Sequence, residues 1–391
     1  MMFLRRRTTS MSPRALLCLE SRRERLLGAS VLAALFYFIV WHLHESSWST
    51  PLSSPPTYYS SFPSCAILLY GSPNGFPVTW PALRRNVILP NAPYGCDYYV
   101  HTFDEDDSTG SQTMDTDRIV EIMQKYFEQQ LPRDPLTRHL VQPATVHVST
   151  STEEEFQTAH ADLLHRVDTK KDELGRPIYF PFFLENGEEF NSTTDTLKIW
   201  HLIQQVWQDM ERHQHPGQPY SRVAMLRWDI VYMTPVDIYQ IDATRRDVQN
   251  KHVVIPGFAK YPVNDRGIYG PAKAVRMWAT ERFRHVDAYV QEYRFKRPGS
   301  GIHSERYMGQ FLLPRMQSKF PKVEVVDRSD WCFYRVQPNH AVWISDCSLP
   351  AHARRDDAVA FVTGCSCSGI NSGPNDVKEI TCCANETAVL Q

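Results

Sequence analysis

One apolar segment near the N-terminus most restricts how this chain can fold. Residues 26–43 (LLGASVLAALFYFIVWHL) carry no Asp, Glu, Lys or Arg and are just long enough to cross a lipid bilayer as a helix. Arginines gather before this segment, whereas neither Lys nor Arg follows it before Arg84. The positive-inside rule therefore predicts a cytosolic tail at 1–25, a transmembrane anchor at 26–43 and a chain that continues on the far side of the membrane.

A cleaved signal peptide is the alternative for the same segment. The basic region before it is long, the apolar run exceeds the usual length of a signal sequence, and no clear small-x-small cleavage site follows. We therefore favour an uncleaved type II signal-anchor. Residues 44–63 are rich in Ser and Pro and have no helical or strand periodicity, which predicts a stem.

The cysteines agree with a lumenal location. Of the nine cysteines, Cys18 alone precedes the anchor, and an even number beyond it suits disulfides in an oxidising compartment. These are Cys65, Cys96, Cys332, Cys347, Cys365, Cys367, Cys382 and Cys383. The last four are spaced unlike zinc knuckles, so disulfides are the better interpretation of the Cys-rich extension at 341–391. The glycosylation sequons at 191–193 and 385–387 give weak further support.

Composition and periodicity predict the fold class of the main domain, residues 64–340. A formal net charge of −2 with 22% charged residues does not indicate nucleic-acid binding. Short apolar runs predict strands at 65–71, 96–103, 144–148, 223–232, 253–256, 323–326 and 332–336. Helical spacing of apolar residues predicts helices at 80–89, 117–131, 153–166, 194–212, 272–293 and 304–313. This alternation predicts an α/β fold with a mostly parallel sheet flanked by helices.

The run at 223–232 (VAMLRWDIVY) places Arg227 and Asp229 in a strand that is otherwise apolar. A buried strand has no packing reason to carry such a pair, because an unpaired buried charge is costly. The pair is tolerable where the strand emerges at a ligand cleft, the usual location of sites in open α/β sheets. An ion pair at the strand end is the structural alternative.

Two later motifs also combine charge with a turn or helix start. In 263–270 (VNDRGIYG), Asn264, Asp265 and Arg266 predict a loop that recognises a sugar or the acceptor, with Gly267 and Gly270 permitting tight turns. The alternative there is an Asx-turn closed by a local salt bridge. In 301–307 (GIHSERY), Glu305 or His303 is a candidate general base. The alternative is that Ser304 caps a helix whose positive end favours Glu305.

Taken in order, the anchor, the stem, LRWDIVYMTPVDIY, VNDRGIYG and HSERY resemble lumenal glycosyltransferase-like families with a GT-A-type nucleotide-sugar fold. The resemblance covers roughly residues 64–340 and implies a Rossmann-like sheet in a Golgi-membrane glycoprotein. It implies transfer of a sugar from a nucleotide-sugar donor to a glycan or glycoprotein acceptor. The implied catalytic residues are Glu305 and Asp265, and the implied substrate-binding residues are Arg227, Asp229, Asn264, Arg266 and His303.

The sequence departs from the best-known pattern because no D-x-D follows the central strand. In metal-dependent relatives that motif holds Mn²⁺ or Mg²⁺ on the diphosphate. Here Arg227 stands in place of the first acid, so Asp229 is the remaining metal ligand and metal dependence is in doubt. The D-x-D at 104–106 follows a strand and reads as a solvated acidic loop, and that at 115–117 reads as a helix start. The departure leaves a catalytically inactive lumenal binding or scaffold protein as the alternative function.

Overall fold

The computed structural model describes residues 64–104, 116–133, 144–180, 182–183, 189–190, 193–293, 301–336, 341–343, 367–372 and 378–382. All of them belong to one compact unit that begins at Tyr59. The predicted anchor at 26–43, the stem and both sequons' asparagines lie outside the described residues. Among the described residues, none of the helices has the length and apolar character needed to cross a membrane.

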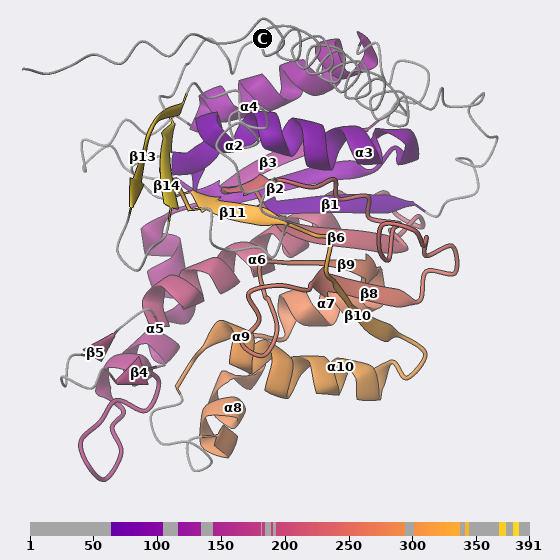
Figure 1. The fold of residues 1–391 in the computed structure, drawn as a ribbon. Coiled ribbons are helices and arrows are strands. Elements are labelled where there is room, and N and C mark those ends of the chain that lie inside the picture. The colour runs from indigo at the N-terminus through magenta and orange to yellow at the C-terminus, as the bar shows by residue number, and fades with distance from the viewer. Residues whose placement is uncertain are drawn as a thin grey trace, which may run out of the picture. The chain divides into compact units, whose positions relative to one another are not determined.

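The described residues build a seven-stranded sheet with the strand order β10-β8-β9-β6-β1-β2-β3 (Figure 1). Its strands are β1 (Cys65–Tyr70), β2 (Asp97–Phe103), β3 (Val146–Ser151), β6 (Arg222–Arg227), β8 (His252–Pro256), β9 (Gly267–Pro271) and β10 (Glu324–Arg328). Within this sheet β9 alone runs antiparallel to its neighbours, β6 and β8. The predicted α/β class with a mostly parallel sheet is confirmed.

Helices cover both faces of this sheet (Figure 1). One face carries α2 (Phe76–Leu83), α3 (Leu89–Asn91) and α4 (Thr116–Lys125), and the other carries α6 (Thr193–His213), α7 (Ala272–Thr280) and α10 (Leu313–Lys319). Successive side chains of a strand point to opposite faces. Ile67 and Leu69 of β1 accordingly belong to one apolar cluster, and Ala66 and Leu68 to the other. The whole of β1 is buried, so it forms the centre of the fold.

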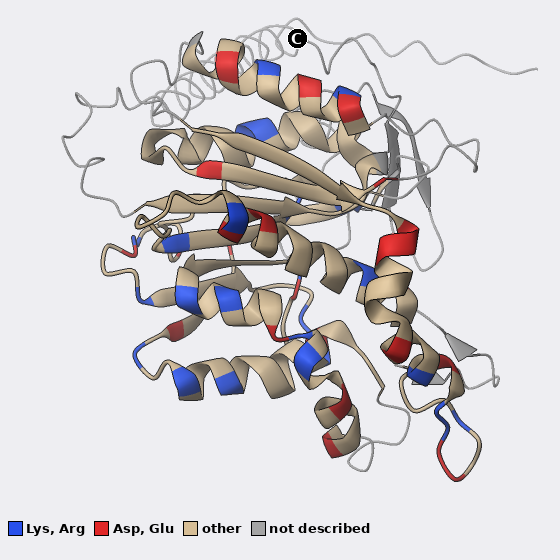
Figure 2. Cartoon of the chain, turned by 180° about the vertical axis from the view of Figure 1, so that it is seen from behind, with Lys and Arg blue, Asp and Glu red and all other residues tan. Residues whose placement is uncertain are grey.

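Shorter helical pieces complete the chain between these elements. The α-helices are α5 (Glu153–Thr169), α8 (Val286–Tyr293) and α9 (Ser304–Tyr307). Wider π-type turns form η3 (Arg84–Ile88), η6 (Tyr126–Gln130) and η9 (Met308–Leu312), and 3₁₀ turns form η2 (Pro73–Gly75), η4 (Ala92–Tyr94), η7 (Leu131–Arg133) and η8 (Phe283–His285). In Figure 2 the Lys, Arg, Asp and Glu residues lie mostly on helices and loops, whereas the strands of the large sheet carry few of them. A charged residue at a strand end is therefore unusual in this sheet.

A second, antiparallel sheet has the strand order β13-β14-β12-β11-β7. It comprises β7 (Ile230–Tyr232), β11 (Phe333–Val336), β12 (Ala341–Trp343), β13 (Cys367–Ser372) and β14 (Lys378–Cys382). Backbone strands from the Cys-rich region thus join the same sheet as β7 of the main domain. A separate two-stranded ribbon pairs β4 (Phe182–Phe183) with β5 (Glu189–Phe190).

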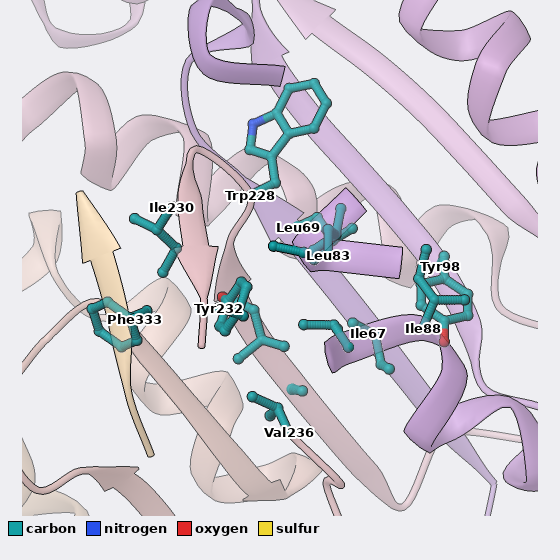
Figure 3. Packing of buried hydrophobic residues seen from close by; sticks show 14 of the residues in the cluster. Ile67, Leu69, Leu83, Ile88, Tyr98, Trp228, Ile230, Tyr232, Val236 and Phe333 are labelled. Atoms are coloured by element: carbon teal, nitrogen blue, oxygen red, sulfur yellow. The ribbon is translucent and has the colours of Figure 1, made fainter. Parts of the chain in front are cut away.

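The predicted single strand at 223–232 is wrong, because the structure divides it between the two sheets. β6 ends at Arg227 and β7 begins at Ile230. The Trp228 indole is buried and packs on the ring of Phe76, at 5.4 Å between ring centroids, which turns the chain out of the first sheet. Figure 3 shows the side chains of Trp228, Ile230 and Tyr232 in one apolar cluster with Leu69 of β1 and Leu83 of α2. Apolar periodicity continues across the turn, which is why the sequence pattern conceals it.

Two further expectations need correction. The helix predicted at 272–293 ends at Thr280, and the Nε of Arg282 donates to the carbonyl oxygen of Trp278 (3.1 Å), one of the acceptors that a helix end leaves without a partner. Gly267 and Gly270 were expected in a turn, but they lie in β9. A Cβ atom at Gly270 would lie 2.7 Å from the carbonyl oxygen of His252. That glycine therefore allows β8 and β9 to approach each other.

A disulfide joins Cys65 to Cys96, with Cα atoms 4.6 Å apart. It links the first residue of β1 to the residue that precedes β2. Cys332 is also disulfide-bonded. The predicted disulfide bonding is confirmed for these three cysteines.

Candidate functional site

The sheet reverses its winding direction between β1 and β6. From β1 the chain adds β2 and then β3 on one side, all parallel, and it later places β6 on the other side of β1. Tyr70 and Arg227, the last residues of β1 and β6, lie directly opposite each other in the register. In open α/β sheets the carboxyl ends of strands at such a reversal are where ligands bind. The chain's unusual strand-end charge, Arg227, therefore lies at the expected place for a site.

The loop that carries the Asn-Asp-Arg motif reaches the same edge of the sheet. It leaves the carboxyl end of β8 at Pro256 and enters the antiparallel strand β9 at Gly267, which pairs with Leu226 of β6. The phenol of Tyr70 donates a hydrogen bond to the carbonyl oxygen of Arg266, at 3.2 Å. The topology thus brings the loop beside the ends of β1 and β6.

Arg227 and Asp229 form a two-pronged ion pair. Arg227 Nε lies 2.7 Å from Asp229 Oδ1, and Arg227 Nη2 lies 2.5 Å from Asp229 Oδ2. The backbone N–H of Ser72 also donates to Oδ2, at 3.3 Å. The two side chains are 25% and 10% exposed, so the pair is screened from solvent but can be reached. The predicted ion pair between Arg227 and Asp229 is therefore confirmed. The pair also lies at the carboxyl end of a strand at the sheet reversal, where ligands bind in such sheets.

Gly71 makes room for this pair. Its φ of +148° favours glycine, and a Cβ atom there would lie 2.7 Å from Asp229 Cγ and 2.8 Å from Asp229 Oδ1. The carbonyl oxygen of Gly71 accepts a hydrogen bond from the hydroxyl of Thr102 on β2, at 2.8 Å. Hydrogen bonds thus connect the ends of β1, β2 and β6 close to the Asp229 carboxylate.

The electrostatics tie Asp265 to the same group. Burial raises the pKa of the Tyr70 phenol, the charges of Arg282 and Arg227 lower it, and the carboxylates of Asp265 and Asp229 raise it again. Burial lowers the pKa of Arg227, but Asp229 and then Tyr70 and Asp265 raise it, and the net change is upward. Tyr70 is therefore neutral and Arg227 charged at neutral pH. Both carboxylates therefore act on both side chains, and the loop that carries Asp265 is held at this edge by the bond between Tyr70 and the Arg266 carbonyl.

Arg282 is a member of this group that the sequence did not reveal. Its side chain is buried, with the guanidinium 4.0 Å from the ring centroid of Trp278. Burial lowers its pKa, and Asp265 and Tyr70 raise it in part. Its Nη2 has no hydrogen-bond partner among the described residues. A buried cation beside the site supplies positive potential that surface charges, which water screens, do not. It was expected within a regular helix, where nothing in the pattern distinguishes it.

Asn264 holds the loop in shape. The residue is buried, its Nδ2 donates to the carbonyl oxygen of Phe258 (3.1 Å), and its Oδ1 accepts from the backbone N–H of Arg266 (3.0 Å). The second bond confirms the Asx-turn of that prediction, whereas the local salt bridge expected to close it stays a prediction. Both polar atoms of Asn264 therefore act within the loop, and the half-buried Asp265 and Arg266 are the residues that it presents at the sheet edge.

His303, not Ser304, caps the short helix α9. His303 Nδ1 accepts from the backbone N–H of Arg306 at 3.4 Å, so the neutral ring carries its proton on Nε2. Burial lowers the pKa of His303, the charge of Arg306 lowers it further, and Asp265 raises it. The Ser304 hydroxyl accepts instead from the indole N–H of Trp200, at 3.0 Å. The predicted Ser304 cap is wrong, because this buried indole and Arg282 engage its oxygen.

The predicted site residues thus lie in two regions: the ends of β1 and β6 with the loop that reaches them, and the start of α9. Arg227 and Asp229 lie at the ends of β1 and β6, the loop with Asp265 and Arg266 is bonded to the same edge through Tyr70, and the charge of Asp265 raises the pKa of His303. Glu305 is half-buried on α9, two residues after His303. Among the described residues no three His, Cys, Asp or Glu side chains are grouped as metal ligands would be. The D-x-D at 104–106 extends beyond the described residues after Asp104.

No model of a known protein family matches this chain. Its sequence also matches none of the curated proteins compared with it. The geometry of the site must therefore carry the functional argument.

Proposed function

We propose that this protein is a glycosyltransferase with a GT-A-like fold that transfers a sugar from a nucleotide-sugar donor to a glycan or glycoprotein acceptor. The observation that carries the proposal is the Arg227–Asp229 pair at the reversal point between β1 and β6. Proteins with this sheet architecture bind ligands at that point. Arginine binds phosphate oxygens well, and with Nε and Nη2 on Asp229 the guanidinium of Arg227 would offer its Nη1 donors to a diphosphate oxygen.

The charged residues around the site fit a nucleotide-sugar donor on one side and an acceptor on the other. Arg227 and the buried Arg282 supply positive potential beside the ends of β1 and β6, where the donor diphosphate would lie. Gly71 lets the backbone approach closely, because it carries no side chain. Asp265, His303 and Glu305 lie on the side of the loop and α9, where the acceptor would bind.

In this proposal an acceptor hydroxyl oxygen forms a bond to the anomeric carbon of the donor sugar. The bond from that carbon to the phosphate oxygen breaks, and the nucleoside diphosphate leaves with the electron pair. Asp265 or Glu305 takes the hydroxyl proton as general base. His303 is the weaker candidate for this role, because its Nδ1 already accepts from the backbone of Arg306 and its Nε2 carries the proton. Its Nε2–H would donate to an acceptor hydroxyl instead.

The described residues fit a bound Mn²⁺ or Mg²⁺ poorly. Asp229 is the proposed metal ligand, but both of its carboxylate oxygens already accept hydrogen bonds from Arg227. A divalent cation would have to displace that guanidinium. We therefore assign the stabilisation of the leaving diphosphate to the arginines, and derive no step through a metal.

The same ion pair favours a second candidate function. An Asp229 carboxylate held by Arg227 from both oxygens would also suit a lumenal binding or scaffold protein that keeps the sheet without catalysis. For either function we propose a single-pass type II protein of the Golgi membrane, anchored by residues 26–43, with N-linked glycans on the lumenal side.

The test uses the full-length chain in detergent with a panel of UDP- and GDP-sugars. We expect donor binding and turnover, and a loss of turnover of about 100-fold or more in Asp229→Asn and Arg227→Met, since each removes a preorganised charge from the diphosphate site. Asp242→Asn is the matched control, because Asp242 forms an exposed ion pair with Arg245 away from the site. Turnover with Mn²⁺ and with EDTA tests the metal. Donor binding without turnover would select the scaffold function, and absence of donor binding would reject both.

A further inference from the structure

Tyr261 presents an exposed aromatic ring at the edge of the candidate site. The side chain is 49% exposed, and the other large apolar side chains that are similarly exposed among the described residues are Leu174 and Val248. Tyr261 lies in the loop between β8 and β9, three residues before Asn264. The loop that carries Asp265 therefore also carries this aromatic surface.

The ring is fixed in position by its neighbours. The guanidinium of Arg306 lies 4.5 Å from the ring centroid, and Arg306 Nη2 donates to the Tyr261 hydroxyl at 2.6 Å. The backbone N–H of Tyr261 donates to the carbonyl oxygen of Val263 at 3.2 Å. Pro262 packs so closely on α9–η9 that a Cβ atom at Gly309 would lie 2.6 Å from Pro262 Cγ. A ring held in this way loses little conformational entropy when a ligand binds.

Polar groups of both kinds flank the ring. The imidazole of His303 lies 5.4 Å from it between ring centroids, and the Asp265 carboxylate acts on that imidazole. The His303 Nε2–H is a donor and the Asp265 carboxylate is an acceptor. An aromatic face bordered by a donor and an acceptor matches a hexopyranose, which has an apolar face of C–H groups and a rim of hydroxyls.

We propose that Tyr261 is the platform on which a hexopyranose ring of the acceptor stacks. The assignment rests on the proposed function, since it names the acceptor class of that same site. A nucleobase would also stack on tyrosine. However, Glu305 lies in the chain between His303 and Arg306, which both contact this ring, and Asp265 lies on the same loop as Tyr261, so a sugar bound here fits the acceptor side of the proposal.

The test measures direct binding of methyl glycosides of glucose, galactose, mannose and N-acetylglucosamine by saturation-transfer NMR on the full-length chain in detergent. We expect at least one glycoside to bind, with about tenfold weaker binding in Tyr261→Ala and retained binding in Tyr261→Trp, which keeps an aromatic face. Leu174→Ala is the matched control, because it removes an exposed apolar side chain from another surface loop and should leave binding unchanged. The thermal midpoint of each variant shows that it is folded.

Three outcomes would overturn the inference: no glycoside binds the native chain at 10 mM (a concentration of the order of a weak Kd), Tyr261→Ala binds as the native chain does, or uridine and guanosine rather than glycosides depend on Tyr261. The proposed function fails separately, through absence of nucleotide-sugar binding to the native chain. Glycoside binding that depends on Tyr261 without nucleotide-sugar binding would therefore keep the platform and reject the glycosyltransferase.

Discussion

The hydrogen bond from the Tyr70 phenol to the carbonyl oxygen of Arg266 crosses the end of β6. Tyr70 ends β1 and Arg266 precedes β9, and β6 lies between these two strands in the sheet. The bond therefore joins the two flanking strands at the point where Arg227 emerges. It ties the Asn-Asp-Arg loop to the centre of the fold, which explains how a loop far along the chain reaches the strand reversal.

Tyr70→Phe removes this bond and should lower the free energy of unfolding by about 1 kcal/mol, the usual net value of one intramolecular hydrogen bond, with a further contribution from the unpaired Arg266 carbonyl. Urea denaturation of the full-length chain measures it. The matched control is Tyr98→Phe on the neighbouring strand β2, because the buried hydroxyl of Tyr98 has no partner among the described residues. That variant should be neutral or stabilising. Equal losses in both variants would contradict the role of the Tyr70 bond.

Gly71→Ala should disturb the Arg227–Asp229 pair. The new Cβ atom would lie within 2.8 Å of the Asp229 carboxylate and of Trp228 Cδ1, at a φ that non-glycine residues rarely adopt. We expect a loss of about 1–3 kcal/mol in unfolding free energy and weaker nucleotide-sugar binding. Gly75→Ala is the control, since a Cβ atom there would make ordinary contacts, with Val336 at 3.4 Å and with Thr79 Cγ2 at 3.7 Å. A native-like Gly71→Ala variant would show that the strand ends are less tightly joined than the structure indicates.

Arg222 forms a buried ion pair at the opposite end of β6 from the site. Its Nη1 lies 2.8 Å from Asp247 Oδ2, and both side chains are almost fully buried. Arg222→Met leaves the Asp247 charge with one partner fewer and should cost about 3–5 kcal/mol. Arg245→Met breaks the exposed pair with Asp242 and should cost at most about 1 kcal/mol. Chemical denaturation measures the free energy of unfolding of both variants. Similar losses in the two would contradict the claim that burial makes the Arg222–Asp247 pair costlier to break.

A buried chain of histidines predicts that the protein loses stability in acid. His201 Nδ1 lies 3.0 Å from His160 Nε2, and His201 Nε2 lies 3.1 Å from the Ser151 hydroxyl, which in turn lies 2.9 Å from His101 Nε2. Burial, then the charges of His160 and His101, lowers the pKa of His201 to about 4 from 6.5. The folded imidazole therefore stays neutral in a range where the unfolded one is protonated.

Because the unfolded state binds more protons between those values, the free energy of unfolding should fall as pH drops from about 6.5 to about 4, by at most roughly 3 kcal/mol from this group. Denaturation at a series of pH values measures the slope. His201→Gln should flatten it, whereas His215→Gln, at an exposed position, should leave it unchanged. A slope identical in the native chain and His201→Gln would refute the assignment to His201.

Some features could be predicted from local patterns and others could not. The buried runs before Gly71 and Arg227 identified β1 and β6, because apolar residues without helical spacing have few alternatives. The sheet reversal depends on pairing between residues far apart in sequence, so it could not be read locally. The residues before Arg227 and those after Asp229 are both apolar. Composition therefore could not show that the chain passes from one sheet to the other at Trp228. Arg282 looked like any helical arginine, since its stacking on Trp278 and its proximity to Asp265 arise only from tertiary packing.

The transfer of the chain from one sheet to the other at Trp228 and Asp229 has a thermodynamic consequence. A ligand that takes Arg227 away from Asp229 would act where β6 ends and just before β7 begins, so we expect its binding to be coupled to the pairing of β7 with β11. By linkage, a change that stabilises this pairing should then alter the affinity for the ligand. Amide protons of those two strands would then exchange at a rate that reports occupancy of a site on the other sheet.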